Sequence, residues 1–205
     1  NKMNSIKETY LTNNNIYFTI VPDKNYFINN GNLKLDYNKL TNLMKNNLKD
    51  FNYIDIFSIL NLDDYYKTDT HWKQENIKKV ALLLSKNMNF DFYDNYNELE
   101  ITSFKGVYSG QLPIKTELDK ITILTNDIIK NSTVYNYETK KETEVYDLTK
   151  VNSLDKYDIY LSGAVSIIDI INNNSGNKEL IVFRDSYGSS LVPLLIQGYK
   201  KITVI

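Results

Sequence analysis

Residues 180–195 read LIVFRDSYGSSLVPLL, an apolar run followed by a polar turn and a second apolar run. The first run, at residues 179–183, predicts a buried strand because it is short and continuously apolar. The second run predicts a short helix, which Pro193 should shorten or kink. The segment KKITVI at residues 200–205 predicts another strand. Strand, helix and strand in this order are typical of a layered α/β sheet.

The N-terminal part of the chain carries the same alternation. Residues 16–21 predict a strand, and the apolar positions within residues 35–49 have the spacing of a helix. Residues 53–60, YIDIFSIL, predict a buried strand, and the apolar positions within residues 72–87 predict a second helix. This order favours a parallel sheet covered by helices.

The middle of the chain has a different pattern. Residues 99–113 and 120–127 predict strands. In residues 132–148 apolar and polar side chains alternate, which predicts an exposed hairpin around ETKKE. We therefore expect one α/β domain over residues 1–205 that carries a β-rich insertion at about residues 98–156. Because the chain stops inside an apolar strand, we also expect a further C-terminal segment in the natural protein.

The composition excludes several classes of protein. The 205 residues include 24 basic and 25 acidic side chains, which gives a net charge of −1. The basic residues are scattered along the chain, so we expect no nucleic-acid partner. The absence of cysteine excludes disulfides, thiolate zinc sites and cysteine nucleophiles. No apolar run approaches the ~20 residues of a membrane span. The polar start is unlike a signal peptide, so we expect that a leader or anchor has been removed.

The junction FRDSYGSS at residues 183–190 is the first candidate for chemistry, since sites in α/β sheets form where strands end and helices begin. Ser186 would lie at the start of the helix, beside backbone N–H groups and the positive end of the helix dipole. These are the parts of an oxyanion hole. The same residues also fit a simple helix cap by Asp185 or Ser186. This segment alone leaves both interpretations open.

The junction YYKTDTHWKQ at residues 65–74 holds the only histidine and the only tryptophan of the chain. A serine hydroxyl needs a base, so any Ser–His mechanism must use His71. Asp69 could accept a hydrogen bond from one ring nitrogen and fix the tautomer. The alternative is that Asp69 or Thr70 caps the helix that begins near Trp72, with the indole as a core anchor.

A metal site is a third interpretation of this loop. Asp63, Asp64, Asp69 and His71 are a weak set of ligands, and their spacing is unlike that of zinc or calcium sites. We therefore expect no metal at this loop and no other cofactor.

The segment YYKTDTHW closely resembles the Asp-x-His-Trp signature of the DHHW family and of the alginate O-acetyltransferase-like proteins, both in the SGNH-hydrolase-like group. LIVFRDSYGSSLVPLL looks like their serine block, and FKGVYSG and YLSGA look like their middle segments. The resemblance spans nearly the whole chain and implies an SGNH-hydrolase-like (flavodoxin-like) three-layer α/β core with a mostly parallel sheet. Two departures stand out: Thr70 replaces a histidine of the DHHW name, and no asparagine lies beside Gly163.

The resemblance implies roles for particular residues. Ser186 would be the nucleophile, His71 the base and Asp69 the carboxylate that orients the base. The oxyanion would be held by the backbone N–H of Ser186 or Tyr187, together with Gly163. The residues expected to bind the substrate are Tyr65, Tyr66, Tyr108 and Arg184.

The resemblance also implies an activity. The protein would be an extracellular or cell-surface acyltransferase or esterase that acts on O-acetyl groups of a cell-envelope carbohydrate. Its partners would be that carbohydrate, an acyl donor and a membrane acyl-transfer protein. The alternative is a non-catalytic module on the same fold that binds or assembles envelope carbohydrate.

Overall fold

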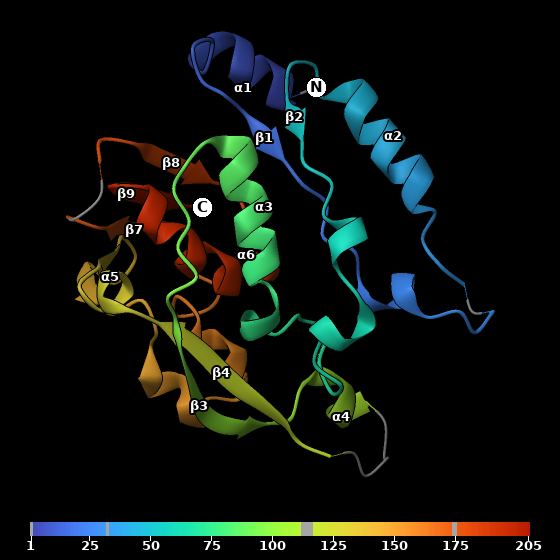
Figure 1. Cartoon of the computed structure of the whole chain (residues 1–205), viewed down its shortest axis with the longest axis vertical. Helices are drawn as coiled ribbons and strands as arrows, with labels where there is room; N and C mark the ends of the chain where they lie inside the picture. The colour runs from blue at the N-terminus through green and yellow to red at the C-terminus, as the bar shows by residue number, and fades with distance from the viewer. Residues whose placement is uncertain (1, 32, 112–116, 174–175) are drawn as a thin grey trace. The chain divides into compact units, whose positions relative to one another are not determined.

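The structure, a computed structural model, describes residues 2–31, 33–111, 117–173 and 176–205 (Figure 1). Contacts along the chain divide it into two compact units, Asn1–Leu62 and Asp63–Ile205. In the described ranges, no helix is both long enough and apolar enough to cross a membrane. The expectations of one domain over residues 1–205 and of a further C-terminal segment stay predictions.

The N-terminal unit combines helices with a small parallel sheet. Its elements are α1 (Lys2–Tyr10), β1 (Tyr17–Phe18), the 3-10 helix Lys24–Phe27, α2 (Tyr37–Asn47), β2 (Asn52–Tyr53) and the 3-10 helix Phe57–Ile59. Strand β1 pairs in parallel with β2. The rings of Tyr26, Tyr37 and Phe57 pack edge to face at centroid distances of 5.0 to 5.3 Å. Such contacts stabilise a unit that has little sheet of its own.

The buried strand predicted for residues 53–60 is wrong. Strand β2 ends at Tyr53, and the chain then turns into the 3-10 helix Phe57–Ile59. The Oδ1 atom of Asp55 accepts a hydrogen bond from the N–H of Phe57 at 2.9 Å. A short acidic side chain that bonds the backbone two residues ahead favours a turn over an extended chain.

The C-terminal unit contains the larger sheet. Its strands and α-helices are α3 (Lys78–Met88), β3 (Asn97–Phe104), α4 (Val107–Gln111), β4 (Asp119–Thr125), α5 (Asp127–Lys130), β5 (Thr133–Asn136), β6 (Lys141–Thr143), β7 (Ile168–Ile171), β8 (Glu179–Val182), α6 (Ser186–Leu191) and β9 (Lys201–Val204). Its 3-10 helices include Gln74–Asn76, Leu148–Asn152, Lys156–Ile159 and Val192–Gly198. The predicted helix within residues 72–87 therefore begins later, at Lys78.

The sheet topology corrects the predicted fold class. In the described part of the chain, five strands form a sheet in the order β6-β5-β7-β9-β8. Strand β3 pairs separately with β4 (Figure 1). Within the five-stranded sheet only β8 and β9 pair in parallel, whereas β5–β6, β5–β7 and β7–β9 are antiparallel. The expected three-layer, mostly parallel SGNH-hydrolase-like (flavodoxin-like) core is therefore wrong. Strands β5 and β6, expected in an insertion, belong to this same sheet.

The end of the chain is the part that the sequence predicted best. Strands β8 and β9 lie within the predicted strands, and α6 lies between them. Pro193 lies in the 3-10 helix Val192–Gly198, so the α-helix does end early, as the missing proline N–H requires. In the middle, β3 ends at Phe104, where α4 soon follows. The strand predicted for residues 99–113 ends in Leu112 and Pro113, which lie outside the described residues.

Gln74 joins three elements inside the C-terminal unit. Its side chain is fully buried, and its Nε2 atom donates to the carbonyl of Ser190 in α6 at 2.7 Å. Its Oε1 atom accepts from the N–H of Leu124 in β4 at 2.7 Å and from the hydroxyl of Tyr146 at 3.1 Å. The loop before α3 is thereby held next to both β4 and α6.

We expect Gln74→Leu to lower the free energy of unfolding by about 2–5 kcal/mol, because the N–H of Leu124 and the carbonyl of Ser190 lose buried partners. Urea denaturation measures the change. Lys130→Ala, at an exposed position, should stay within about 0.5 kcal/mol of the wild type. Equal stability of the Gln74 variant and the wild type would contradict this account of the junction.

Candidate active site

Ser186 lies where strand β8 passes into helix α6. Asp185 is the residue before the helix, and its Oδ1 atom accepts from the N–H of Tyr187 at 3.0 Å. The cap is therefore Asp185, and the Ser186 hydroxyl is left for other partners. Ser186 is exposed, so a substrate can reach its hydroxyl from solvent.

The fold places the imidazole of His71 between this serine and a carboxylate. The Nε2 atom of His71 lies 2.7 Å from the Oγ atom of Ser186, 115 positions along the chain. The Nδ1 atom lies 2.6 Å from the Oδ1 atom of Asp69, which is 1% exposed. An ionised carboxylate can only accept, so Nδ1 carries the proton and Nε2 accepts from the serine hydroxyl. This is the geometry of a nucleophile, a base and an orienting acid.

Hydrogen bonds from the His71 ring and from two backbone N–H groups hold Asp69 in its ionised form. Its Oδ1 atom also accepts from the N–H of His71 at 3.0 Å, and its Oδ2 atom accepts from the N–H of Val107 at 3.0 Å. Burial opposes the charge, but the bonds from His71 and Val107 outweigh it and hold the pKa of Asp69 below its usual value. Gly106 allows this approach, since a Cβ atom there would lie 2.2 Å from the Cβ of Asp69.

Asp119, at the start of β4, clamps the backbone just before the acid. Its Oδ2 atom accepts from both the N–H and the hydroxyl of Thr68 at 2.6 Å, and its Oδ1 atom accepts from the N–H of Lys67 at 2.9 Å. The Oγ1 atom of Thr68 in turn accepts from the N–H of Gly106 at 3.0 Å. The loop that carries the acid and base is thus fixed by buried bonds on both sides.

Two aromatic residues beside His71, Tyr157 and Trp72, make contacts that the sequence did not predict. The ring of Tyr157 stacks on the imidazole of His71, with centroids 3.9 Å apart and planes 12° apart. Trp72 is fully buried, as predicted for an anchor, but its Nε1 atom donates to α6, at the Oγ atom of Ser190. Neither Tyr157 nor Asp119 lies in a motif, so no signal in the sequence identifies them.

The predicted substrate contacts of Tyr65 and Tyr66 are wrong. These side chains are 2% and 1% exposed, so they belong to the core and offer no face to a ligand. The Tyr66 hydroxyl lies 3.5 Å from that of Tyr160, and its ring packs edge to face on Phe104. Burial raises the pKa of Tyr66 far above its usual value. Tyr108 is half-buried in α4, and its contact with substrate stays a prediction.

Arg184 spans from the serine turn to the turn at Gly163. Its Nη2 atom donates to the carbonyl of Gly163 at 2.8 Å, and its Nη1 atom donates to the Oγ atom of Ser189 at 2.8 Å. Its stem crosses Gly188, where a Cβ atom would lie 2.6 Å from the Cβ of Arg184. The guanidinium therefore links two backbone segments of the site. A contact of Arg184 with substrate stays a prediction.

Two of the predicted oxyanion donors are already used. The N–H of Gly163 donates to the carbonyl of Tyr160 at 3.1 Å, and the N–H of Tyr187 donates to Asp185. The N–H of Ser186 has no acceptor within the part of the chain that the structure describes. The N–H of Ser186 is therefore the predicted donor that lacks another acceptor in the described ranges, and the oxyanion roles of Tyr187 and Gly163 stay predictions.

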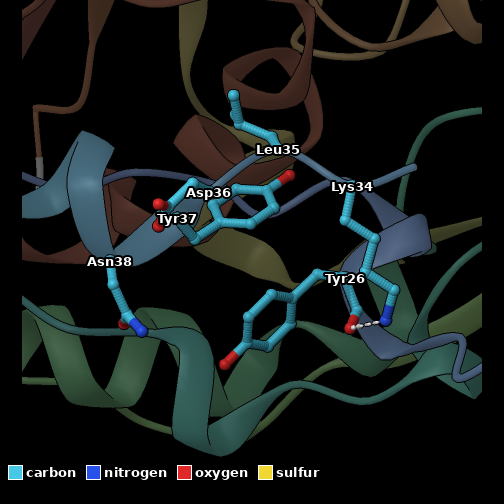
Figure 2. Close-up of a pocket in the computed structure, with 6 residues that line it drawn as sticks. All are labelled: Tyr26, Lys34, Leu35, Asp36, Tyr37 and Asn38. Atoms are coloured by element: carbon cyan, nitrogen blue, oxygen red, sulfur yellow. Dashed lines mark hydrogen bonds between the residues drawn. The ribbon is translucent and has the colours of Figure 1, made fainter.

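A cluster of metal ligands or a pocket could also hold a ligand in the described residues. Across those ranges, no three His, Cys, Asp or Glu side chains gather as metal ligands. A pocket of about 250 Å³ lies in the N-terminal unit, and Figure 2 shows the side chains that line it. Its lining residues are Tyr26, Lys34, Leu35, Asp36, Tyr37 and Asn38. The Nζ atom of Lys34 in this pocket already donates to the carbonyl of Tyr26 at 3.3 Å (Figure 2).

Comparison with known proteins supports the fold. The sequence matches no family model and no curated protein. The structure is similar to that of a DHHW family protein from Eubacterium siraeum, with a TM-score of 0.78 and 20% identity over 93% of this chain and 68% of that chain. It is also similar to PatB1 of Bacillus cereus with a sulfonyl adduct, with a TM-score of 0.76 and 17% identity over 98% and 76%. The resemblance to the DHHW family is thus confirmed at the level of the fold.

The lowered pKa of Asp69 predicts a loss of stability in acid. A carboxyl whose folded-state pKa is depressed stabilises the fold above its unfolded-state pKa, about 3.9. That contribution is lost as the pH falls through the lower folded-state value. We therefore expect the free energy of unfolding to fall more steeply below about pH 4 in the wild type than in Asp69→Asn.

Urea denaturation, from neutral pH down to about pH 3, measures this difference. Asp91→Asn, at an exposed position, is the control and should keep the pH dependence of the wild type. Parallel curves for the wild type and Asp69→Asn would show that the carboxylate of Asp69 is not held in its charged form.

Proposed function

We propose that this protein is a serine acyltransferase or esterase that acts on O-acetyl groups of a cell-envelope carbohydrate. One observation carries the proposal: the Nε2 atom of the only histidine lies 2.7 Å from the Oγ atom of exposed Ser186. The buried carboxylate of Asp69 on the other ring nitrogen completes the set. The imidazole can accept the proton of the serine hydroxyl, and the carboxylate can stabilise the imidazolium that forms.

The first half of the reaction forms an acetyl-enzyme. His71 takes the proton of the Ser186 hydroxyl as the Oγ atom attacks the carbonyl carbon of the acetyl ester. Asp69 stabilises the imidazolium that results. The tetrahedral intermediate collapses when the C–O bond to the leaving alcohol breaks, and His71 returns its proton to that oxygen. The acetyl group is then an ester on Ser186.

The second half releases the acetyl group. Water or a sugar hydroxyl loses its proton to His71 and attacks the acetyl carbonyl. The bond between the acetyl carbon and the Oγ atom of Ser186 then breaks, and His71 returns the proton to that oxygen. Water makes the enzyme an esterase, and a sugar makes it a transferase. The N–H of Ser186 is positioned on the nucleophile itself and can donate to the oxyanion in both halves.

The nature of the substrate rests on similarity. PatB1 of Bacillus cereus, on a similar fold, carries a sulfonyl adduct, and an activated nucleophile forms such an adduct when it attacks a sulfonyl reagent. The DHHW resemblance supports acetyl transfer to envelope carbohydrate at the cell surface. An acyl donor and a membrane acyl-transfer partner are part of the same proposal.

We expect the wild type to hydrolyse p-nitrophenyl acetate and to accumulate one acetyl group on Ser186, as found by peptide mass spectrometry. Ser186→Ala and His71→Ala should each lower kcat by about 10³-fold or more, since they remove the nucleophile and the base. Ser132→Ala removes a buried hydroxyl bonded to the carbonyl of Ile128 and should leave the rate unchanged.

Equal rates for the wild type and Ser186→Ala would overturn the proposal and leave the non-catalytic binding module as the function. Addition of a cell-wall oligosaccharide separates the two chemistries. A transferase acetylates the oligosaccharide and releases nitrophenol faster, whereas an esterase releases acetate at an unchanged rate.

A further inference from the structure

The hydroxyl of Ser190 is a junction of buried hydrogen bonds beside the triad. Its Oγ atom accepts from the Nε1 atom of Trp72 at 2.9 Å and lies 2.7 Å from the hydroxyl of Tyr157. It also lies 3.4 Å from the carbonyl of Tyr187, to which it can donate. An indole N–H can only donate, so Ser190 must accept from Trp72. Ser190 is fully buried, and therefore water does not compete for these bonds.

The Tyr157 hydroxyl suits the donor role. Tyr157 is 3% exposed, and burial raises the pKa of its hydroxyl well above the usual value, so the group keeps its proton. It donates to Ser190, while the hydrogen of Ser190 points to the carbonyl of Tyr187. With this assignment the Ser190 hydroxyl accepts from Trp72 and Tyr157 and donates to Tyr187.

Both partners of Ser190 act on the base. Trp72 follows His71 directly in the chain, so its indole bond fixes the backbone that carries the imidazole. Tyr157 stacks its ring on the imidazole at 3.9 Å, so the ring of the base cannot turn towards that side. Ser190 therefore fixes His71 twice, once through the backbone and once through the ring.

The same helix carries the nucleophile. Ser186 and Ser190 lie four positions apart in α6, one turn of the helix, so they share a face. A second connection runs beside the first, because the Tyr187 hydroxyl donates to the carbonyl of Thr70 at 2.9 Å. The distance between His71 and Ser186 is therefore set by bonds that originate on a single turn of helix.

We propose that Ser190 and Tyr157 are positioning residues that hold His71 at hydrogen-bonding distance from Ser186. Both residues act through His71. The proposal rests on the proposed function, because that function supplies the reaction in which His71 would be the base. A base displaced by about 1 Å can cost about 10²-fold in rate. The bonds to Ser190 oppose such a displacement, beside the bond from the Trp72 indole to the carbonyl of Tyr187 at 3.1 Å.

The chain offers a clean test, because it has one histidine and one tryptophan. The NMR signals of the His71 imidazole and the Trp72 indole N–H are therefore unique. We expect Ser190→Ala to shift both, and Tyr157→Phe, which keeps the stacked ring, to shift the indole signal more weakly. Ser85→Ala is the matched control: Ser85 is also buried, and its hydroxyl donates to the nearby carbonyl of Leu82.

The second readout is the reaction of Ser186 with phenylmethanesulfonyl fluoride. We expect Ser190→Ala to lower the limiting labelling rate by about 10- to 100-fold and Tyr157→Phe by about 2- to 10-fold. The reagent concentration for half-maximal rate should stay unchanged, because neither residue touches the reagent. Ser85→Ala should label like the wild type.

The outcomes separate the two proposals. Wild-type labelling rates in both Ser190→Ala and Tyr157→Phe, or an unchanged imidazole signal in Ser190→Ala, would overturn the positioning role. If the wild type is not labelled while the imidazole and indole signals shift as expected, the proposed function fails and the positioning geometry stands. A reduced limiting rate together with shifted signals supports both.

Discussion

The hydrogen bond between His71 and Ser186 is the contact around which the C-terminal unit is organised. It joins two loops 115 positions apart, and neither loop would keep its place by local structure alone. One loop is clamped by Asp119 and by the backbone of Val107. The other begins a helix whose next turn bonds back to Trp72. Polar contacts that are buried and satisfied define such a geometry more sharply than apolar packing does.

Exposure changes steadily along the triad. Asp69 is 1% exposed, His71 is 8% exposed, and Ser186 is open to solvent. The charge thus lies at the protected end, where three bonds from His71 and Val107 compensate the cost of burial. The reactive hydroxyl lies at the open end. This arrangement keeps the carboxylate ionised while leaving room for a substrate at the serine.

The arrangement of Ser186 and His71 forms although the sheet is mostly antiparallel and not mostly parallel as expected. The parallel pair β8–β9 and the helix between them form a strand–helix–strand unit within a mostly antiparallel sheet. That local unit is enough to present Ser186 at the start of α6. The proposed function therefore depends on this junction and on the histidine loop, and not on the strand order of the whole sheet.

The sequence by itself determined which residue could be the histidine base of the proposed reaction, because the chain has a single histidine, and it predicted the strand–helix–strand pattern at its end. Local periodicity and residue chemistry carry that information. Only the tertiary structure decided the antiparallel sheet, the burial of Tyr65 and Tyr66, and the use of the Gly163 and Tyr187 N–H groups. It alone also placed Asp119 and Tyr157 beside the triad. These features arise from contacts between residues far apart in the chain, which no local pattern records.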